Sequence, residues 1–478
     1  MSFNKPVQKS RLWRFRVNER RNLLIVIDLV VAFVALGIAL YYWAISEKYL
    51  GFTFLFLERR VPPWFFLFPF AWIILLVELY DVHRAGDWKA TVKGITRTAL
   101  IGFGIYLFLY FYYADPPRSL LPRRGVASFL IIVSLATLIW RLLYIKIFTA
   151  PRFMRRVLIV GGGNAGRSLL NVINNLWPPP FHIVGLVDDD PQKDSLEIEG
   201  YKVLGSSENL GKIILEQEVS DIIVAISGEL GSGMFQGLVD AQENGIAITR
   251  MPKVYEEVLG RVPIRLLEAD WILRSFVDEI YVSSFDEFGK RLLDILGGLI
   301  GVLILTLLTP FITLMFLIDD GRPVFYSQTR LGRGGQNYTI IKFRTMRRDA
   351  EADGVPRWAK EDDQRATRSG RFLRKTHLDE WPQFLNVLRG EMSLVGPRAE
   401  RPELVAYFEK HVPFYRARLL VKPGITGWAQ VNFGYASTIE ETMVKLEFDL
   451  YYIKNRNLVM DFVILLRTPS TILGLRGR

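Results

Sequence analysis

The stretch ILGGLIGVLILTLLTPFITLMFLI, residues 295–318, carries no charged side chain from end to end. An apolar run of about 20 residues is long enough to cross a bilayer as a helix. Its one strong interruption is Thr309-Pro310, because proline removes a backbone donor and kinks a helix. The run therefore predicts a membrane helix that is broken at Thr309 and Pro310.

Four more apolar blocks occupy the first 150 residues, at 23–44, 64–77, 99–114 and 126–140. Lysine and arginine are concentrated before the first block, after the second and after the fourth. Since cytoplasmic loops carry the excess of cations, we predict a four-helix transmembrane bundle over residues 1–150 with both ends in the cytoplasm. Asp28 lies inside the first block and is predicted to snorkel to the helix end or to pair with another helix.

The composition limits the kinds of site that the chain can build. Lys and Arg number 60 against 49 Asp and Glu, and the mean hydropathy of +0.19 is high for a soluble enzyme. Cysteine is absent, which excludes disulfides and cysteine-ligated metals, and the four histidines are scattered. Any metal would be a hard ion on carboxylates. Nucleic-acid binding is disfavoured, because the basic residues cluster beside apolar runs and carboxylates.

Residues 151–280 have the pattern of a parallel α/β unit. Strand-like runs at 155–160, 182–187, 221–227 and 246–250 alternate with helical segments. Gly161, Gly163 and Gly166 follow the first strand, and Asp188 ends the second, which is the spacing of a dinucleotide fingerprint. The unit is therefore either Rossmann-like with NAD or another nucleotide bound, or a fold whose glycines only make a tight turn. Both interpretations stay open, since three prolines at 178–180 break the unit early.

A strand is predicted over residues 338–346, with Lys342 and Arg344 on one face and Ile341 and Phe343 on the other. Two neighbouring cations repel each other unless an anion lies between them. The pattern thus indicates a phosphate-binding edge. The alternative is a solvated strand edge whose charges discourage aggregation.

Adjacent carboxylates, Asp379 and Glu380, follow the cations Arg371, Arg374 and Lys375. A helix is predicted to start here, either with a capping box from Thr376 to Asp379 or nearer Glu380, with Pro382 in the first turn and Gly390 at the end. A helix N-terminus attracts anions, and the cations are expected to keep Asp379 ionised and nucleophilic. The two carboxylates can divide attack and metal binding between them.

Two later turn-rich segments, 396–402 and 422–430, complete the set of candidate anion ligands. They contribute Arg398, Arg401 and Lys422, together with backbone amides, to a predicted phosphate site that also contains Lys342, Arg344, Arg371 and Arg374.

The ordered motifs together resemble the catalytic domain of the monotopic phosphoglycosyl transferases, the bacterial sugar transferase family. The resemblance runs from about Ser284 to the C-terminus. The motifs are KFRTM (342–346), DDQRATRSGRFLRKTHLDEWPQ (362–383), SLVGPRAER (393–401), KPGITGWAQV (422–431) and KLEFDLYYIKN (445–455). With the bundle and the Rossmann-like unit in front, the chain looks like the long members, the polyprenyl glycosylphosphotransferases. His377 and Ala399 depart from the family pattern, which has a small hydroxyl residue and a proline there.

This resemblance implies transfer of sugar-1-phosphate from a UDP-hexose to undecaprenyl phosphate, with release of UMP. It implies that Asp379 is the nucleophile, that Glu380 is the partner of Mg²⁺ or Mn²⁺, and that Lys342, Arg374 and Arg398 bind phosphate. The reaction would be the first membrane step of exopolysaccharide, O-antigen or capsule synthesis, at the bacterial inner membrane. The sequence leaves open the hexose and the oligomeric state, for which a homodimer is one candidate.

Topology then decides how residues 295–318 meet the membrane. A fifth full span would put residues 319–478 outside the cell, away from a nucleotide-activated substrate. We therefore predict a re-entrant helix over about 291–318, within a monotopic α/β catalytic domain at 281–478 whose working face is cytoplasmic.

Two rival functions fit parts of the pattern. A membrane-bound, NAD-dependent nucleotide-sugar epimerase or dehydratase explains the Rossmann-like unit, and Tyr338 and Lys342 even have the catalytic spacing of such enzymes. They lie, however, on a predicted strand beyond that unit. A membrane scaffold with a nucleotide-sensing domain is the second rival, and the intact Asp379–Glu380 pair argues against it.

Overall fold

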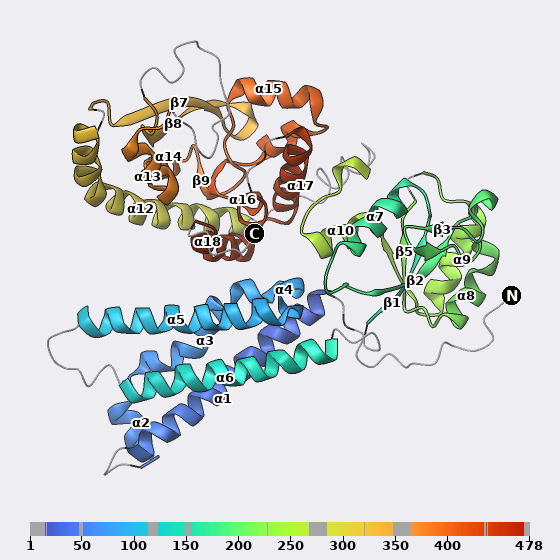
Figure 1. The fold of residues 1–478 in the computed structure, drawn as a ribbon, viewed down its shortest axis with the longest axis horizontal. Helices are drawn as coiled ribbons and strands as arrows, with labels where there is room; N and C mark the ends of the chain where they lie inside the picture. Colours follow the sequence, from blue (N-terminus) through green and yellow to red (C-terminus); the bar gives the residue numbers. More distant parts are fainter. Residues whose placement is uncertain are drawn as a thin grey trace. The chain divides into compact units, whose positions relative to one another are not determined.

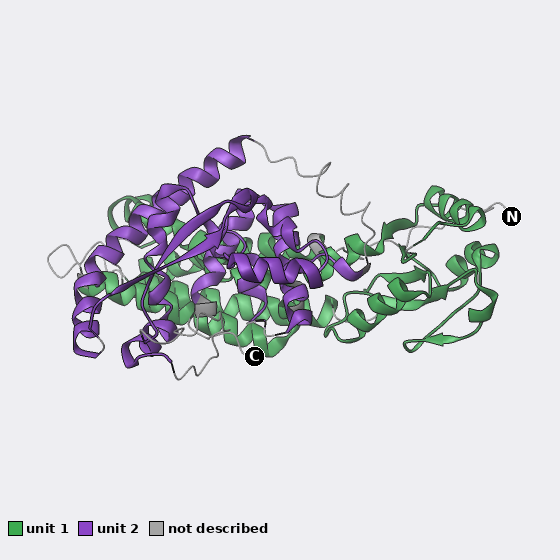
Figure 2. Cartoon of the chain, turned by 90° about the horizontal axis from the view of Figure 1, so that it is seen from above, with its two compact units in different colours: residues 1–259 green, residues 260–478 purple. Residues whose placement is uncertain are grey.

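The computed structural model divides the chain into two compact units, Met1–Leu259 and Gly260–Arg478 (Figure 2). The predicted division into three domains stays a prediction. The structure describes residues 15, 17–46, 51–112, 123–148, 154–226, 228–266, 284–319, 321–347, 365–434, 436 and 438–472.

Long apolar helices form the first part of the first unit (Figure 1). They are α1 (Val17–Ser46), α5 (Trp88–Tyr112) and α6 (Arg123–Phe148). Among the described residues, four helices are long and apolar enough to cross a membrane: Glu19–Ser46, Trp88–Phe111, Arg123–Phe148 and Ser284–Asp319. The protein is thus membrane-associated. Three of these helices match predicted blocks, and the fourth contains the run at 295–318.

The second predicted block, 64–77, does not form one long helix. It consists of η1 (Pro63–Leu67), α3 (Phe68–Leu75) and η2 (Val77–Tyr80), and it follows the short α2 (Phe54–Arg60). Proline at the starts of η1 and α3 accounts for the breaks before these two pieces, since its missing N–H is tolerated only in a first turn, whereas no proline lies between α3 and η2.

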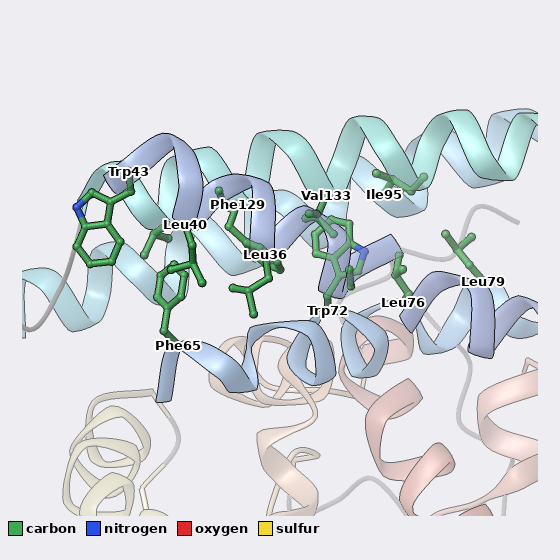
Figure 3. Close-up of a cluster of buried hydrophobic side chains, with 14 of the residues drawn as sticks. Leu36, Leu40, Trp43, Phe65, Trp72, Leu76, Leu79, Ile95, Phe129 and Val133 are labelled. Atoms are coloured by element: carbon green, nitrogen blue, oxygen red, sulfur yellow. The ribbon is translucent and has the colours of Figure 1, made fainter. Parts of the chain in front are cut away.

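These three pieces nevertheless run the length of the bundle beside α6. The rings of Phe68 and Phe129 lie 5.3 Å apart, Trp72 Nε1 donates to Thr137 Oγ1 at 3.1 Å, and Arg141 Nη1 donates to the Leu79 carbonyl at 2.9 Å. Figure 3 shows the same order, from Phe65 beside Trp43 to Leu79. The broken segment therefore covers the depth that α6 covers between residues 129 and 141.

A buried ion pair joins the first and last helices of this bundle. Arg141 Nη2 lies 2.6 Å from Asp28 Oδ2, and both side chains are fully buried. The helix-paired alternative predicted for Asp28 is therefore confirmed. Because Arg141 also binds the Leu79 carbonyl, a single guanidinium links three segments of the bundle.

A parallel sheet in the order β2-β1-β5-β6 forms the α/β part of the first unit. Its strands are β1 (Arg156–Val160), β2 (His182–Val187), β5 (Asp221–Val224) and β6 (Ala247–Arg250), and a small hairpin joins β3 (Glu197–Ile198) to β4 (Tyr201–Lys202). The helices of this part are α7 (Asn164–Asn174), α8 (Leu210–Glu216), α9 (Ser232–Glu243) and α10 (Met251–Leu259). The short α4 (Val82–Gly86) comes earlier in the chain and packs with the apolar helices. All four predicted strands are present, so a Rossmann-like arrangement is consistent with the structure.

The second unit carries two small sheets among helices. An antiparallel hairpin pairs β7 (Phe325–Leu331) with β8 (Asn337–Phe343), and a parallel pair joins β9 (Ser393–Val395) to β10 (Gly424–Thr426). The helices are α12 (Ser284–Asp319), α13 (Arg368–Thr376), α14 (Gln383–Arg389), α15 (Pro402–His411), α16 (Trp428–Asn432), α17 (Ile439–Asn455) and α18 (Leu458–Ile472).

Helix α12 packs one face on this unit through glycines. A Cβ on Gly297 or Gly301 would lie 2.5 Å from Leu394 or 2.3 Å from Phe384, so only glycine permits this close approach. The opposite face is apolar and exposed, with Leu303 63% and Phe311 73% accessible. An apolar surface of this kind marks a contact with lipid or with another protein.

Helix α12 runs without interruption from Ser284 to Asp319, so the predicted break at Thr309 and Pro310 is instead a proline inside one helix that turns along its length (Figure 1). The Thr309 hydroxyl donates to the Leu305 carbonyl at 2.7 Å, so a side chain binds backbone at the predicted break. Near one end Asp294 accepts from the Leu394 amide at 2.8 Å, and at the other Asp319 accepts from the Ser369 amide at 2.7 Å. Both ends of α12 are thus fixed to the same unit.

The second unit begins at Gly260. Val262 and Ile264 are almost completely buried in its hydrophobic core. Trp428 Nε1 donates to the Gly260 carbonyl at 2.7 Å. The segment from Gly260 onward therefore belongs to the body that holds the candidate site.

Candidate active site

The Asp379–Glu380 pair lies in a tight turn between two helices. Helix α13 ends at Thr376, and His377 then adopts the left-handed conformation with φ of 56°. Asp379 and Glu380 follow in the 3-10 turn η9 (Leu378–Glu380). Because the chain reverses at His377, the two carboxylates leave the axis of α13 before α14 begins.

The two predicted helix starts have different outcomes. The Thr376 hydroxyl donates to the Phe372 carbonyl 2.9 Å away inside α13, so the predicted capping box is wrong. Helix α14 (Gln383–Arg389) ends before Gly390, whose φ is 83°, as the second alternative predicted, but it starts only after Pro382, later than the predicted start near Glu380. The carboxylates thus precede α14 rather than lie in its first turn.

Glu380 is held by two cations from distant segments. Lys342 Nζ on β8 lies 2.7 Å from Oε1. Arg398, from the loop after β9, places Nη2 2.5 Å from Oε1 and Nη1 3.1 Å from Oε2. The Glu380 side chain is only 12% exposed. Charge-assisted bonds of this number fix the carboxylate firmly.

The pair has opposite pKa shifts. Burial raises the pKa of Glu380, but Arg398 and Lys342 outweigh it and hold that pKa well below its ordinary value. Burial and the charge of Glu380 raise the pKa of Asp379 to about 6, against the smaller effects of Lys342, Arg398 and Arg374. The cations were expected to dominate at Asp379, and here the loss of solvation is larger. Above pH 6 the carboxylate form of Asp379 still prevails.

Three of the seven predicted phosphate ligands act on the carboxylate pair. Lys342 and Arg398 contact Glu380, and Arg374, half-buried on α13, influences Asp379 electrostatically. Arg371 lies one turn earlier on α13 and is exposed.

Arg344 and Lys422 have other surroundings. The buried Arg344 guanidinium donates to the Gly321 carbonyl at 2.7 Å, beyond the end of α12. Lys422 has a pKa lowered by burial and then by Arg291, a residue of α12. Arg401 is the N-cap of α15. The structure therefore does not group these three residues with Glu380 through any contact that it describes.

A buried charge network that the sequence did not reveal supports Arg398. Arg418, 4% exposed, donates through Nη2 to the Arg398 carbonyl at 2.9 Å and lies 3.0 Å from Asp449 Oδ2. Lys445 pairs with Glu400 at 3.0 Å. The one available signal was the pair of acidic residues on the apolar helix motif 445–455. Arg418, the partner of Asp449, lies in a stretch without a motif.

The carboxylates fit a metal only together with substrate. In the described ranges no group of three or more His, Asp or Glu side chains is placed to hold an ion. Magnesium is usually bound by one or two carboxylates with water and substrate phosphates. Asp379 and Glu380 satisfy that smaller requirement, although both oxygens of Glu380 are already ion-paired.

The glycine turn of the first unit packs against backbone and side-chain groups of the same unit. A Cβ on Gly166 would lie 2.1 Å from the Gly161 carbonyl, so the turn requires glycine for packing alone. Asp188 Oδ2 accepts from the Gly162 amide at 2.6 Å and from Lys193 Nζ at 3.1 Å. These bonds account for Asp188 without a nucleotide. These contacts are compatible with both interpretations, and nucleotide binding by Gly161, Gly163, Gly166 and Asp188 stays an untested prediction.

Comparison with known proteins adds the family. A family model described as bacterial sugar transferase matches residues 285–474, and one described as CoA-binding domain matches residues 64–252. The UDP-galactose-lipid carrier transferase of Erwinia amylovora is 30% identical over 341 residues, which are 68% of this chain and 69% of that protein. The chain belongs to the bacterial sugar transferase family.

Two further relatives are similar to smaller parts of this sugar transferase. The UDP-N-acetylgalactosamine-undecaprenyl-phosphate N-acetylgalactosaminephosphotransferase of Aeromonas hydrophila is 39% identical over 228 residues, or 48% of this chain. The match spans about half of that relative, 52% of its length. The uncharacterized sugar transferase EpsL of Bacillus subtilis is 38% identical over 190 residues, which cover 39% of this chain and 89% of EpsL.

Proposed function

We propose that this sugar transferase moves sugar-1-phosphate from a UDP-hexose to undecaprenyl phosphate and releases UMP. The observation that carries the proposal is the half-buried Asp379 beside Glu380, with Lys342 and Arg398 on the Glu380 carboxylate. The site combines a nucleophile with cations for a diphosphate. Relatives named for transfer to undecaprenyl phosphate or to a lipid carrier point to the same class of reaction.

In the first step a carboxylate oxygen of Asp379 attacks the phosphorus that bears the sugar. The bond from that phosphorus to the bridging oxygen breaks, and UMP leaves with the electron pair. An aspartyl-phosphosugar remains on the protein. The pKa of about 6 supports this role, because Asp379 is then ionised at neutral pH while burial leaves it poorly solvated.

The cations neutralise the charge that develops on the leaving UMP. In the free protein Lys342 and Arg398 bind Glu380, and Arg374 acts on Asp379. A diphosphate that enters beside Glu380 meets donors that are already ordered. Such preorganised charge is worth more at the transition state than solvent, because it needs no rearrangement during the reaction.

In the second step a phosphate oxygen of undecaprenyl phosphate attacks the phosphorus of the adduct. The bond to the Asp379 oxygen breaks and the carboxylate is regenerated, which yields undecaprenyl-diphosphate-sugar. Mg²⁺ or Mn²⁺ bound by Asp379 and Glu380 would neutralise part of the diphosphate charge. Two bulky anionic substrates thereby use one site in turn.

The membrane arrangement follows from α12 and the bundle. We propose that α12 re-enters the membrane instead of crossing it, since Asp294 and Asp319 near its two ends both bind the same unit. Four passes, with 63–80 as the broken second one, return the chain to the cytoplasm before this unit begins. The reaction would then take place at the cytoplasmic face of the bacterial inner membrane, where the acceptor phosphate lies.

The test is UMP release by the purified full-length protein in nanodiscs, with a panel of UDP-hexoses. With undecaprenyl phosphate we expect multiple turnovers. Without it we expect a burst of at most one UMP per active site, because the adduct has no acceptor. Absence of UMP release from every UDP-sugar, by protein that is folded, would overturn the proposal.

The epimerase alternative loses its geometric support. Tyr338 and Lys342 lie on β8 in the second unit, opposite β7, and not on the sheet that carries the glycine turn. Lys342 is ion-paired with Glu380. The spacing of the two residues thus reflects a strand, as the sequence indicated.

A further inference from the structure

Asn386 is a completely buried polar residue of α14 whose side chain bonds mainly to the backbone of β8. Its Oδ1 accepts from the Ile341 amide at 3.2 Å. Its Nδ2 donates to the Thr339 carbonyl at 2.8 Å and to Glu391 Oε2 at 2.7 Å. Two of the three partners are therefore backbone groups of β8.

The Asn386 side chain makes the two bonds to β8 that the backbone of a neighbouring strand would otherwise make. β8 belongs to a two-stranded sheet and pairs with β7 along one edge. The carbonyl of Thr339 and the amide of Ile341 point together from its other edge, and an amide side chain offers one donor and one acceptor to match them. Asn386 therefore fixes β8 both along its length and in its distance from α14.

The same two segments carry the ion pair of the site. Lys342 directly follows Ile341 on β8, and Glu380 lies in the turn that leads into α14. We propose that Asn386 is a positioning residue, which sets the Lys342 ammonium against Glu380 and so places a cation for the substrate diphosphate. This inference rests on the proposed function and adds to it a residue that contacts no reacting atom.

A positioning role differs from a purely stabilising one in what it changes. A buried amide with its bonds satisfied stabilises any fold, and its loss lowers the melting temperature wherever it lies. A displaced cation instead lowers turnover, since a shift of about 1 Å in a catalytic group can cost about 100-fold in rate. The two roles therefore separate when activity is compared at matched stability.

The experiment is a double-mutant cycle on the full-length protein, with Asn386→Leu, Lys342→Met and the double variant, read as kcat/KM for UMP release. We expect Asn386→Leu to lower kcat/KM at least about 10-fold in the wild-type background, mainly through kcat. In the Lys342→Met background the same change should cost less than about 3-fold, because the group that it positions is gone.

Two more variants serve as controls, one for a general loss of stability and one for a leucine variant that does not fold. Ile453→Ala, at a fully buried position on α17, supplies a stability control in the same unit. It should leave kcat near wild type below its melting temperature. Asn386→Asp keeps the acceptor for Ile341 but loses the donor to Thr339, and it replaces Asn386→Leu in the cycle if the leucine variant does not fold.

The outcomes separate the positioning role of Asn386 from the proposed function. Equal losses from the Asn386 change in both backgrounds, or an Ile453→Ala variant that loses as much activity at an equal melting temperature, overturn the positioning role alone. Wild-type protein that releases no UMP overturns the proposed function, and the positioning role with it.

Discussion

Lys342 and Glu380 form an ion pair of 2.7 Å between a strand and a turn that are separated in sequence by a long charged segment. The pair is largely shielded, with the lysine side chain 19% and the glutamate side chain 12% exposed. It links the fold to the chemistry, because the β7–β8 hairpin has to pack on α14 before the two groups can meet.

Asp379→Asn should abolish UMP release. An amide has nearly the same shape as the carboxylate but cannot form the covalent adduct, and loss of a nucleophile costs about 10⁴-fold or more in turnover. The burst of UMP without acceptor should vanish as well. A folded Asp379→Asn protein with near-normal turnover would remove the covalent step.

Activity should fall on acidification with a midpoint near pH 6. The reactive form of Asp379 is the carboxylate, and its pKa is raised to about 6, so the rate should drop about tenfold per pH unit below that value. The measurement is kcat/KM from pH 4.5 to 8, with circular dichroism to confirm folding. A rate that stays constant down to pH 5 contradicts the assignment.

Chelation of divalent ions should stop the reaction. Activity should vanish in EDTA and return with Mg²⁺ or Mn²⁺, since the carboxylate pair and a diphosphate together provide the oxygen ligands that such an ion needs. Glu380→Gln should impair turnover strongly and raise the Mg²⁺ concentration needed for half-maximal rate. Continued turnover in chelator would exclude the metal from the scheme.

A protein that starts at Gly260 should outperform one that starts at Ser284. Both retain α12, the carboxylate pair and every cation of the site, and EpsL shows that a short relative exists. The shorter version loses the buried Val262 and Ile264, each worth about 1.5–3 kcal/mol of burial. We expect transfer by the Gly260 version and a lower melting temperature for the Ser284 version, measured in nanodiscs.

If the Gly260 version folds and is wholly inactive, the first unit contributes to catalysis and this division of labour is wrong. Equal melting temperatures for the two versions would mean that Val262 and Ile264 contribute nothing to stability.

Cysteine labelling should place both ends of α12 in the cytoplasm. The chain has no cysteine of its own, so Ser284→Cys and Asp320→Cys each provide a single reactive thiol. In intact spheroplasts neither should react with an impermeant maleimide until the membrane is opened. Reaction of the residue 320 thiol from outside would prove a full span.

The sequence was sufficient where a motif is local. Asp379, Glu380, Lys342 and Arg398 each stand in a short motif that the sequence shows, and the structure brings these motifs together, while their predicted roles stay predictions. Arg344 does not join them, since the chain leaves β8 at Phe343 and carries Arg344 to the Gly321 carbonyl. Alternation along a strand cannot show where that strand ends.

Other features depend on contacts between distant segments. The bonds from Asn386 to β8 and from Arg418 to the Arg398 carbonyl are set by packing, and neither residue stands in a pattern that marks it. The second apolar block looked like one helix because its hydropathy is uniform. Proline separates η1 from α3, and a further break without proline at Leu76 separates α3 from η2.

The Asp28–Arg141 pair has a consequence for how the protein is made. The two residues are 113 positions apart, so α1 enters the membrane with its carboxylate well before α6 exists. A lone aspartate at the centre of a membrane helix costs about 2.5–3.5 kcal/mol during insertion, and here the remaining apolar residues of α1 have to offset it. When α6 inserts, Arg141 pairs with Asp28 and neutralises the charge of its carboxylate. A chain that stops before α6 therefore keeps Asp28 inside the membrane without its ion-pair partner.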